Sequence, residues 1–177
     1  VIEIAKEGEI FSSVTESNGI YTPVYKNENL AYAVFQIYAA EDIATLDGTV
    51  RYQQGELVDE ITTGKDGIAK SKQLYLGKYT VIEKAAPDTF YNPNGQYDVE
   101  LTYAGQDIKV ISTALSVFND RQKVSVSLLK ELSQDERFKL GINGEILSVQ
   151  FGVFASEDIN AADGSIIHAD GLITHGN

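Results

Sequence analysis

The sequence predicts an all-β fold, a small β-sandwich followed by the first half of a second, tandem copy. Apolar and polar residues alternate along much of the 177-residue chain, and long helical periodicity is scarce. Asp-Gly and Asn-Gly pairs, which suit turns that need a positive φ, separate the alternating runs. One stretch of sequence also occurs twice, which indicates a repeated domain.

The alternating runs give the predicted strands in chain order. Segment 12–29 is polar and interrupted by glycine and proline, so we expect an ordered excursion there. Segment 41–46 is compatible with a short helical turn. The predicted strands are 1–6, 33–39, 50–53, 57–62, 77–84, 96–103, 107–112, 114–119 and 123–130.

The repeat sets the expected domain boundary. FQIYAAEDIATLDG begins at Phe35 and returns without a gap at Phe151 as FGVFASEDINAADG, an offset of 116 residues. A period this long is typical of tandem domains, because solenoid repeats are much shorter. We therefore expect a complete domain over 1–122 and the N-terminal half of a second over 123–177, in a segment of a longer chain.

The amino-acid composition limits the classes of molecule that this chain is expected to bind. The net charge of −12 opposes binding to phosphate backbones and anionic membrane surfaces, so we expect neither nucleic acid nor membrane as a partner. The chain has no cysteine, which excludes disulfides and thiolate chemistry. The acidic clusters do not match the spacing of a calcium-binding loop, so we expect no metal and no other cofactor.

Three predicted strands place a polar residue on an apolar face. Residues two apart in a strand share a face, and by this rule Lys6, Glu83 and Asn119 point into the core. A lysine at a strand end can also extend its amine to solvent. However, the three lie near the start, middle and end of one domain, where a sandwich can bring first and last strands together. A buried lysine and a buried carboxylate are each costly unless they meet.

The second copy repeats part of this pattern. Val124, Val126, Leu128 and Lys130 share one face of segment 123–130. Lys130 is thus the second-copy lysine, and its expected glutamate and asparagine partners have no counterpart within the 177 residues. We therefore expect Lys130 to lack these partners in this chain, and we expect protection from hydrogen exchange to concentrate in residues 1–122.

The run YTVIEKAAPDTFY, residues 79–91, resembles the E-box of CnaB-type domains, also called SpaA-like or prealbumin-like domains. The E-box reads roughly Y-x-V-x-E-x-x-A-P-x-G-Y, and this chain departs from it at Thr89, where the family usually has glycine. The lysine strand, the E-box and the asparagine strand occur in the family's order. The resemblance implies a prealbumin-like or Ig-like sandwich from the stalk of a Gram-positive surface adhesin or pilin.

The resemblance also implies a self-formed isopeptide bond between Lys6 and Asn119, assisted by Glu83. An apolar site disfavours charge, which would leave the lysine as a nucleophilic amine and the glutamate protonated. The protonated acid would polarise the carboxamide of Asn119 and carry protons as ammonia leaves. Folding holds the reactants together and the reaction occurs once per molecule, so the implied protein is not an enzyme.

The implied function is a structural stalk module, secreted and held at the bacterial cell surface through the cell wall, with neighbouring repeat domains as partners. An alternative is an adhesin module that binds a host extracellular protein or glycan through surface loops such as 12–29 or 88–95. Aromatic contacts would come from Tyr21, Tyr25, Tyr91 and Tyr97. A transthyretin-like hydrolase is a third option. His168 and His175 are the only histidines and both follow residue 122, which argues against that option.

Overall fold

The computed structural model describes residues 1–131, 133–139, 141 and 149–176. Regular secondary structure in this part of the chain consists of β-strands alone, which confirms the predicted fold class. The chain divides into two compact units: unit 1 contains Val1–Glu9 and Asn27–Gln122, and unit 2 contains Ile10–Lys26 and Lys123–Asn177.

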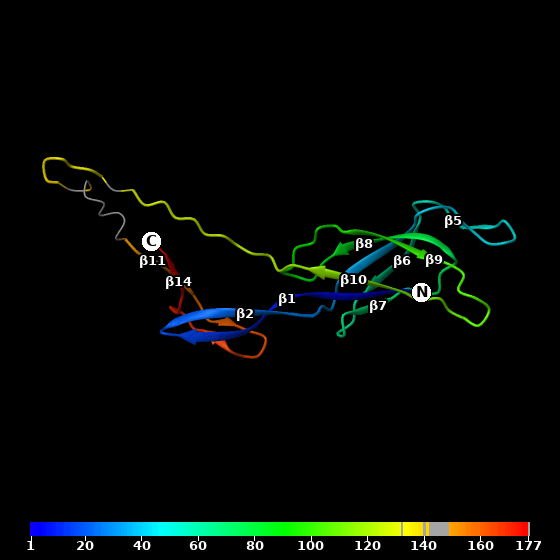
Figure 1. Ribbon diagram of the computed structural model, residues 1–177, viewed down its shortest axis with the longest axis horizontal. Coiled ribbons are helices and arrows are strands. Elements are labelled where there is room, and N and C mark those ends of the chain that lie inside the picture. The colour runs from blue at the N-terminus through cyan, green and yellow to red at the C-terminus, as the bar shows by residue number, and fades with distance from the viewer. Residues whose placement is uncertain (132, 140, 142–148, 177) are drawn as a thin grey trace. The chain divides into compact units, whose positions relative to one another are not determined.

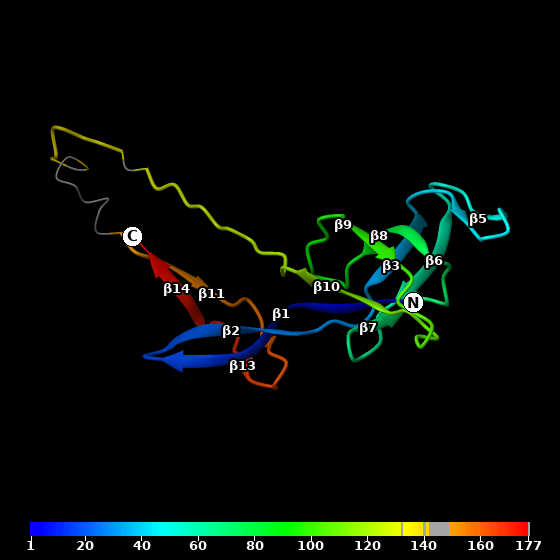
Figure 2. The ribbon, with the colours of Figure 1, turned by 45° about the vertical axis from the view of Figure 1, so that its right-hand side comes forward.

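Unit 1 is a sandwich of two sheets (Figures 1 and 2). One is a four-stranded antiparallel sheet in the order β6-β3-β8-β9. In the other, the first part of β1 lies between β10, which is parallel to it, and β7, which is antiparallel. A small hairpin, β4–β5, completes the unit. The strands are β1 (Ile2–Ser17), β3 (Val34–Ala39), β4 (Ile43–Ala44), β5 (Val50–Tyr52), β6 (Leu57–Thr62), β7 (Ile68–Lys70), β8 (Gly77–Ala85), β9 (Gln96–Leu101) and β10 (Thr113–Asn119).

The core of unit 1 lies between these two sheets. Alternate residues of each strand point inward, as the period of two requires. Phe35 and Ile37 of β3 are fully buried, as are Ile2 and Ile4 of β1. Tyr79 is the largest fully buried side chain, and its hydroxyl donates a hydrogen bond to the Tyr75 carbonyl oxygen (2.7 Å). This bond satisfies the one polar atom that Tyr79 brings into the core.

Unit 2 combines a hairpin from early in the chain with the C-terminal strands. The second part of β1 and β2 (Ile20–Asn29) form the hairpin, and β14 (Leu172–Gly176) pairs with β2 at Leu172 and Ile20. β11 (Phe151–Phe154) pairs antiparallel with β14, and β12 (Ile159–Asn160) with β13 (Ile166–Ile167). These pairings match those of β3 with β6 and of β4 with β5 in unit 1.

Several predicted elements differ from the structure. Segment 41–46 contains strand β4 instead of a helical turn, and the 12–29 excursion belongs to the β1–β2 hairpin. Segments 107–112 and 123–130 form no strand. In segment 123–130, the alternation of apolar and polar residues did not lead to a strand, because a strand needs a neighbouring strand to pair with. Val124 and Val126 of this segment remain 95% and 79% exposed.

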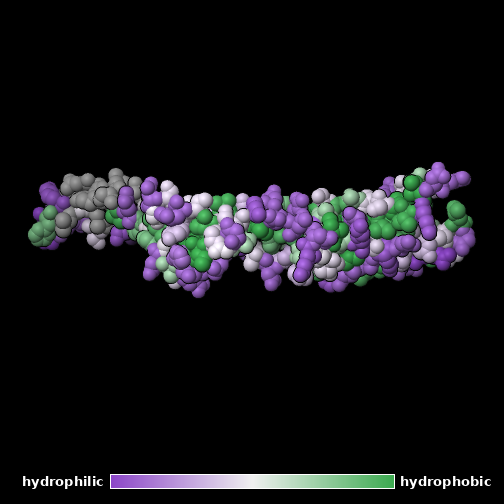
Figure 3. Space-filling model, turned by 90° about the horizontal axis from the view of Figure 1, so that it is seen from below, coloured by the Kyte–Doolittle hydropathy of each residue, from purple (hydrophilic) through white to green (hydrophobic). Residues whose placement is uncertain are grey.

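The unit boundary after Gln122 coincides with the expected domain boundary, while Ile10–Lys26 groups with unit 2. The assignment of 1–122 and 123–177 as separate domains stays a prediction. The face drawn in Figure 3 is mainly hydrophilic, with small hydrophobic groups between the polar ones. No helix suited to spanning a membrane occurs among the described residues.

Candidate functional site

The two sheets of unit 1 bring Lys6, Glu83 and Asn119 together. Lys6 lies on β1 opposite Val117 of the parallel strand β10, and Asn119 follows two residues later on β10. Two residues along a strand share a face, so the side chains of Lys6 and Asn119 project to the same side of adjacent strands. Glu83 comes from β8 in the other sheet, where it pairs with Phe35 of β3.

All three polar side chains are buried, as strand parity predicted. The exposed fractions are 1% for Lys6, 0% for Glu83 and 1% for Asn119. None reaches solvent in the way that a lysine at a strand end often does, so the snorkelling alternative is wrong for Lys6.

One carboxylate oxygen faces both nitrogens of the site. The Asn119 Nδ2 donates a hydrogen bond to Glu83 Oε1 (2.8 Å), and the Lys6 Nζ lies 4.0 Å from that oxygen. The Lys6 amine also donates to the carbonyl oxygens of Glu7 (3.0 Å) and Val117 (3.4 Å). Glu83 Oε2 and Asn119 Oδ1 are buried without a hydrogen-bond partner in the described part of the chain.

Burial shifts both ionisable groups toward their neutral forms. Desolvation lowers the pKa of Lys6, and the nearby Glu83 carboxylate opposes this by favouring the ammonium. Desolvation likewise raises the pKa of Glu83, against the opposing effects of Lys6 and of the Asn119 hydrogen bond. Formation of an amide requires a neutral amine, which is nucleophilic, and a neutral carboxylic acid, which can donate a proton. Burial favours both of these protonation states.

Gly8 permits the close approach of β1 and β10 beside the site. A Cβ atom there would lie 2.7 Å from the backbone oxygen of Asn119 and 2.5 Å from the Leu30 side chain. Sequence reasoning missed this residue, although an isolated glycine within a strand commonly marks a close backbone contact. It also missed Asn92, whose Nδ2 donates to the backbone carbonyl of Glu83 (3.1 Å).

The loop that follows Glu83 holds the chain just beyond Asn119. The Tyr91 N–H donates to the Asp120 carbonyl (2.9 Å), and the Gln122 N–H donates to the Thr89 carbonyl (3.0 Å). Thr89 has a φ of 75°, a left-handed conformation that a β-branched residue adopts only under strain. Thr89 therefore occupies, at a cost, the conformation for which the E-box has glycine.

Substituting Thr89→Gly is expected to stabilise unit 1. Removing a left-handed β-branched residue relieves about 1–2 kcal/mol of strain, and the greater freedom of glycine in the unfolded chain offsets part of this gain. We expect a net gain of about 0.5–1 kcal/mol in the free energy of unfolding, measured by denaturant titration. Thr89→Ala keeps a Cβ and should gain less; an equal gain from both variants would contradict the strain argument.

The remaining predicted residues are not part of this site. Lys130 is exposed, in a segment without assigned strand structure. With Val126, Leu128 and Phe151 it lines an open, mostly apolar groove of about 820 Å³ in unit 2. Of the tyrosines in the alternative adhesin loops, Tyr21 packs edge-on against His168 and Tyr25 contacts Phe11, whereas Tyr91 is 61% exposed.

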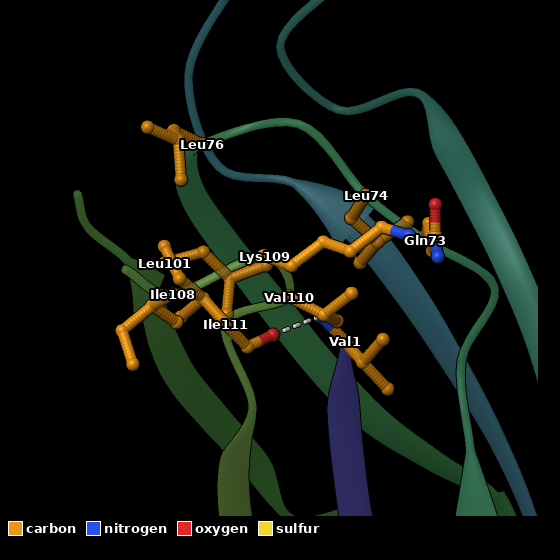
Figure 4. A pocket seen from close by; sticks show the side chains of 9 residues that line it. All are labelled: Val1, Gln73, Leu74, Leu76, Leu101, Ile108, Lys109, Val110 and Ile111. Atoms are coloured by element: carbon orange, nitrogen blue, oxygen red, sulfur yellow. Dashed lines mark hydrogen bonds between the residues drawn. The ribbon is translucent and has the colours of Figure 1, made fainter. Parts of the chain in front are cut away.

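A small hollow of about 140 Å³ lies at the start of β1 (Figure 4). Apolar side chains such as Leu74, Leu101 and Ile111 line most of it. The Val1 amine donates to the Ile111 carbonyl there (2.7 Å), and partial burial lowers the pKa of this amine. No cluster of three or more potential metal ligands occurs in the described residues.

One protein-family model matches the chain and agrees with this architecture. A SpaA prealbumin-like fold domain model matches residues 22–114, which include Glu83 but neither Lys6 nor Asn119. No curated protein sequence matches the chain.

Among solved structures, the chain is similar to the minor pilin of Streptococcus agalactiae at 14% identity and a TM-score of 0.45, with 73% of this chain and 47% of that one covered. It is similar to the major pilin subunit of Bacillus cereus at 16% identity and a TM-score of 0.41, covering 68% and 28%. It is also similar to the Bacillus anthracis TIE protein at 18% identity and a TM-score of 0.46, with 99% of this chain and 26% of that one covered.

The chain thus spans less than half the length of each of these three proteins. The match to the family model covers more than half of the 177 residues, and the all-β sandwich of unit 1 agrees with it. This chain belongs to the family of SpaA prealbumin-like fold domains.

Proposed function

We propose that the chain is part of the structural stalk of a bacterial cell-surface protein, and that an isopeptide bond between Lys6 and Asn119 locks unit 1. The observation that carries this proposal is the completely buried set of Lys6, Glu83 and Asn119, with Glu83 Oε1 facing both nitrogens. Family membership supports the stalk role. The proposal includes an extracellular location held through the cell wall.

The bond forms by exchange of one amine for another. The neutral Lys6 Nζ attacks the Asn119 Cγ, a new C–N bond forms, and the Cγ–Nδ2 bond breaks to release ammonia. Glu83 Oε1 lies on the path of the proton, because it contacts Nδ2 at 2.8 Å and lies 4.0 Å from Nζ. The carboxyl group takes the proton that Nζ loses and returns it to the departing nitrogen. Atoms and charge therefore balance, and the carboxyl group ends in the protonation state in which it began.

Half a turn of the Asn119 carboxamide brings its oxygen toward Glu83. In that orientation the protonated acid donates a hydrogen bond to Oδ1 and polarises the Cγ carbon for attack. The two buried atoms without partners, Glu83 Oε2 and Asn119 Oδ1, are the atoms that this rearrangement would satisfy.

The bond would join the first and last strands of unit 1. β1 carries Lys6 and the neighbouring strand β10 carries Asn119, so a pull on the chain on either side of the unit would load the covalent bond before the sheets. This route suits a stalk module that bears tension. The matching pairings of β3–β6 and β11–β14 support tandem modules as the units of that stalk.

Mass spectrometry tests the proposed bond directly. The purified chain should weigh less than its sequence by one ammonia, and a digest should contain a branched peptide that joins the Lys6 and Asn119 segments. Asn119→Ala removes the acceptor and should restore the full mass. The exposed Lys130 should appear in linear peptides only. An unmodified wild-type mass would refute the bond.

The unlinked Glu83→Gln variant should gain stability as pH rises. Without the carboxylate that favours the ammonium, burial lowers the pKa of Lys6 further below that of a lysine in the unfolded chain, about 10.4. Between these two pKa values the unfolded state binds more protons, so stability increases with pH by up to about 1.4 kcal/mol per unit and falls again on acidification.

Denaturant titrations over a pH series measure this slope. The matched control is the double variant Glu83→Gln/Lys6→Met, which lacks the buried amine and should lose the Lys6 contribution to the slope. Equal slopes for the single and double variants would show that Lys6 has an ordinary pKa when folded.

A further inference from the structure

The turn between β12 and β13 is the repeat equivalent of the turn between β4 and β5. In the first, the Ser165 N–H donates to Asp163 Oδ1 (2.9 Å); in the second, the Thr49 N–H donates to Asp47 Oδ1 (3.0 Å). The glycine after each aspartate has a positive φ, 86° and 79° respectively. The two turns therefore present the same backbone and a hydroxyl at the same position.

In unit 2 the β1–β2 hairpin binds this turn (Figures 1 and 2). Two N–H groups of the turn donate to carbonyl oxygens of β1, and one N–H of β1 donates to the turn's hydroxyl. The bonds are Ala162 N to Phe11 O (3.0 Å), Asp163 N to Ser12 O (3.1 Å) and Val14 N to Ser165 Oγ (2.7 Å). The hairpin thus binds the turn mainly through backbone groups of both segments.

The equivalent turn of unit 1 has no such partner. In the described part of the chain, the Leu46 N–H has no hydrogen-bond acceptor and the Asp47 N–H interacts only with its own carboxylate, whereas their counterparts in unit 2 each donate to a carbonyl oxygen of β1. The Leu46 side chain is fully exposed, at 112% of its reference area. A large apolar residue at the tip of a turn, beside two N–H groups that donate to no other residue, is a surface that a partner can cover.

We propose that the β4–β5 turn, residues 45–49, is a docking surface for a β1–β2 hairpin carried by another copy of this module. Each module of a tandem chain would then extend its hairpin onto the turn of the next, so that successive modules interlock through backbone hydrogen bonds. The interlocking of successive modules in a stalk rests on the proposed function, whereas the binding of the hairpin to the turn does not.

The chemistry of the exposed turn fits the hairpin. Thr49 offers the hydroxyl acceptor that Ser165 supplies to Val14 in unit 2. Hydrogen bonds from Ser165 are the main cause that lowers the pKa of Asp163, and the charge of the hairpin's Lys26 adds a smaller contribution. Asp47 provides a carboxylate at the matching position. Leu46 replaces the alanine of the second copy and adds apolar area for the hairpin to cover.

The isolated interaction is expected to be weak. A short covalent connection between modules raises the effective concentration of the hairpin to about the millimolar range, so a comparable dissociation constant suffices for docking within a chain. The test must therefore reach millimolar concentrations of the hairpin.

NMR titration of the ¹⁵N-labelled 177-residue chain provides that test. The probe is a synthetic peptide of residues 9–27 closed by a disulfide between added terminal cysteines, because an open hairpin is marginally stable. We expect saturable shifts at the amides of residues 46 and 47, as these N–H groups gain acceptors. Half-saturation should fall near about 1 mM.

Matched variants identify the contact. Thr49→Ser recreates the hydroxyl of the second copy and should bind the peptide as wild type does, whereas Thr49→Val keeps the shape, loses the acceptor and should bind several-fold more weakly. A peptide N-methylated at Val14 lacks the donor and should show the same loss on the wild-type chain.

Three results would overturn the proposal: no saturable change at residues 45–49, shifts confined to residues 161–165, or equal binding by the methylated peptide. Repeating the titration on Asn119→Ala, which cannot form the isopeptide bond, should give the same affinity. The experiment therefore distinguishes absence of the isopeptide bond from absence of hairpin docking.

Discussion

The Glu83→Ala variant will have the full mass of its sequence and will melt far below the wild-type chain. The proposed bond closes a loop of 113 residues between Lys6 and Asn119. Loop-entropy reasoning developed for disulfides assigns about 4–5 kcal/mol to a closure of this length. For a unit of this size, that corresponds to a decrease in melting temperature on the order of 15–40 °C, measurable by calorimetry.

Asn119→Ala separates the bond from the buried charge. Glu83→Ala leaves Lys6 buried without its carboxylate, whereas Asn119→Ala keeps that pair and removes the acceptor. Both variants should lose the loop term, and the double variant should lose it once, so the effects will be strongly non-additive. A decrease of only about 1–3 kcal/mol for Asn119→Ala, the cost of one buried hydrogen bond, would contradict a covalent link.

Phe35→Ala will destabilise the chain much more than Phe151→Ala, although the two residues occupy the same position of the repeat. Phe35 is fully buried between the sheets of unit 1, and its truncation should cost about 3–5 kcal/mol. Phe151 is partly exposed beside an open groove, so its truncation should cost about 1 kcal/mol or less. Denaturant unfolding followed at probes in each unit measures both values.

Mass spectrometry of each variant provides the control, because Phe35 pairs with Glu83 and its loss can slow bond formation. The comparison is valid only between samples with the same extent of cross-linking. Equal costs for the two truncations would show that a second core, comparable to that of unit 1, covers Phe151.

The local pattern of the chain determined the inward faces of unit 1. Side chains alternate across a strand, so the parity of residues 2–6, 79–83 and 115–119 was enough to direct Lys6, Glu83 and Asn119 inward. The repeated Asp-Gly pair likewise determined two matching turns, because an aspartate and a following glycine with positive φ specify that turn locally.

Pairing between distant segments was decided only by the tertiary structure. Alternation in 123–130 resembles that of the first strand, yet this segment has no strand structure, since its pattern does not supply a neighbouring edge. The hairpin over Ile10–Lys26 packs in unit 2, and the sequence contains no sign of this, because most of the hydrogen bonds that the hairpin makes there join backbone groups, which carry no sequence signal. The meeting of Lys6, Glu83 and Asn119 is non-local in the same way: parity determined the direction of each side chain, and the stacking of two sheets determined that they meet.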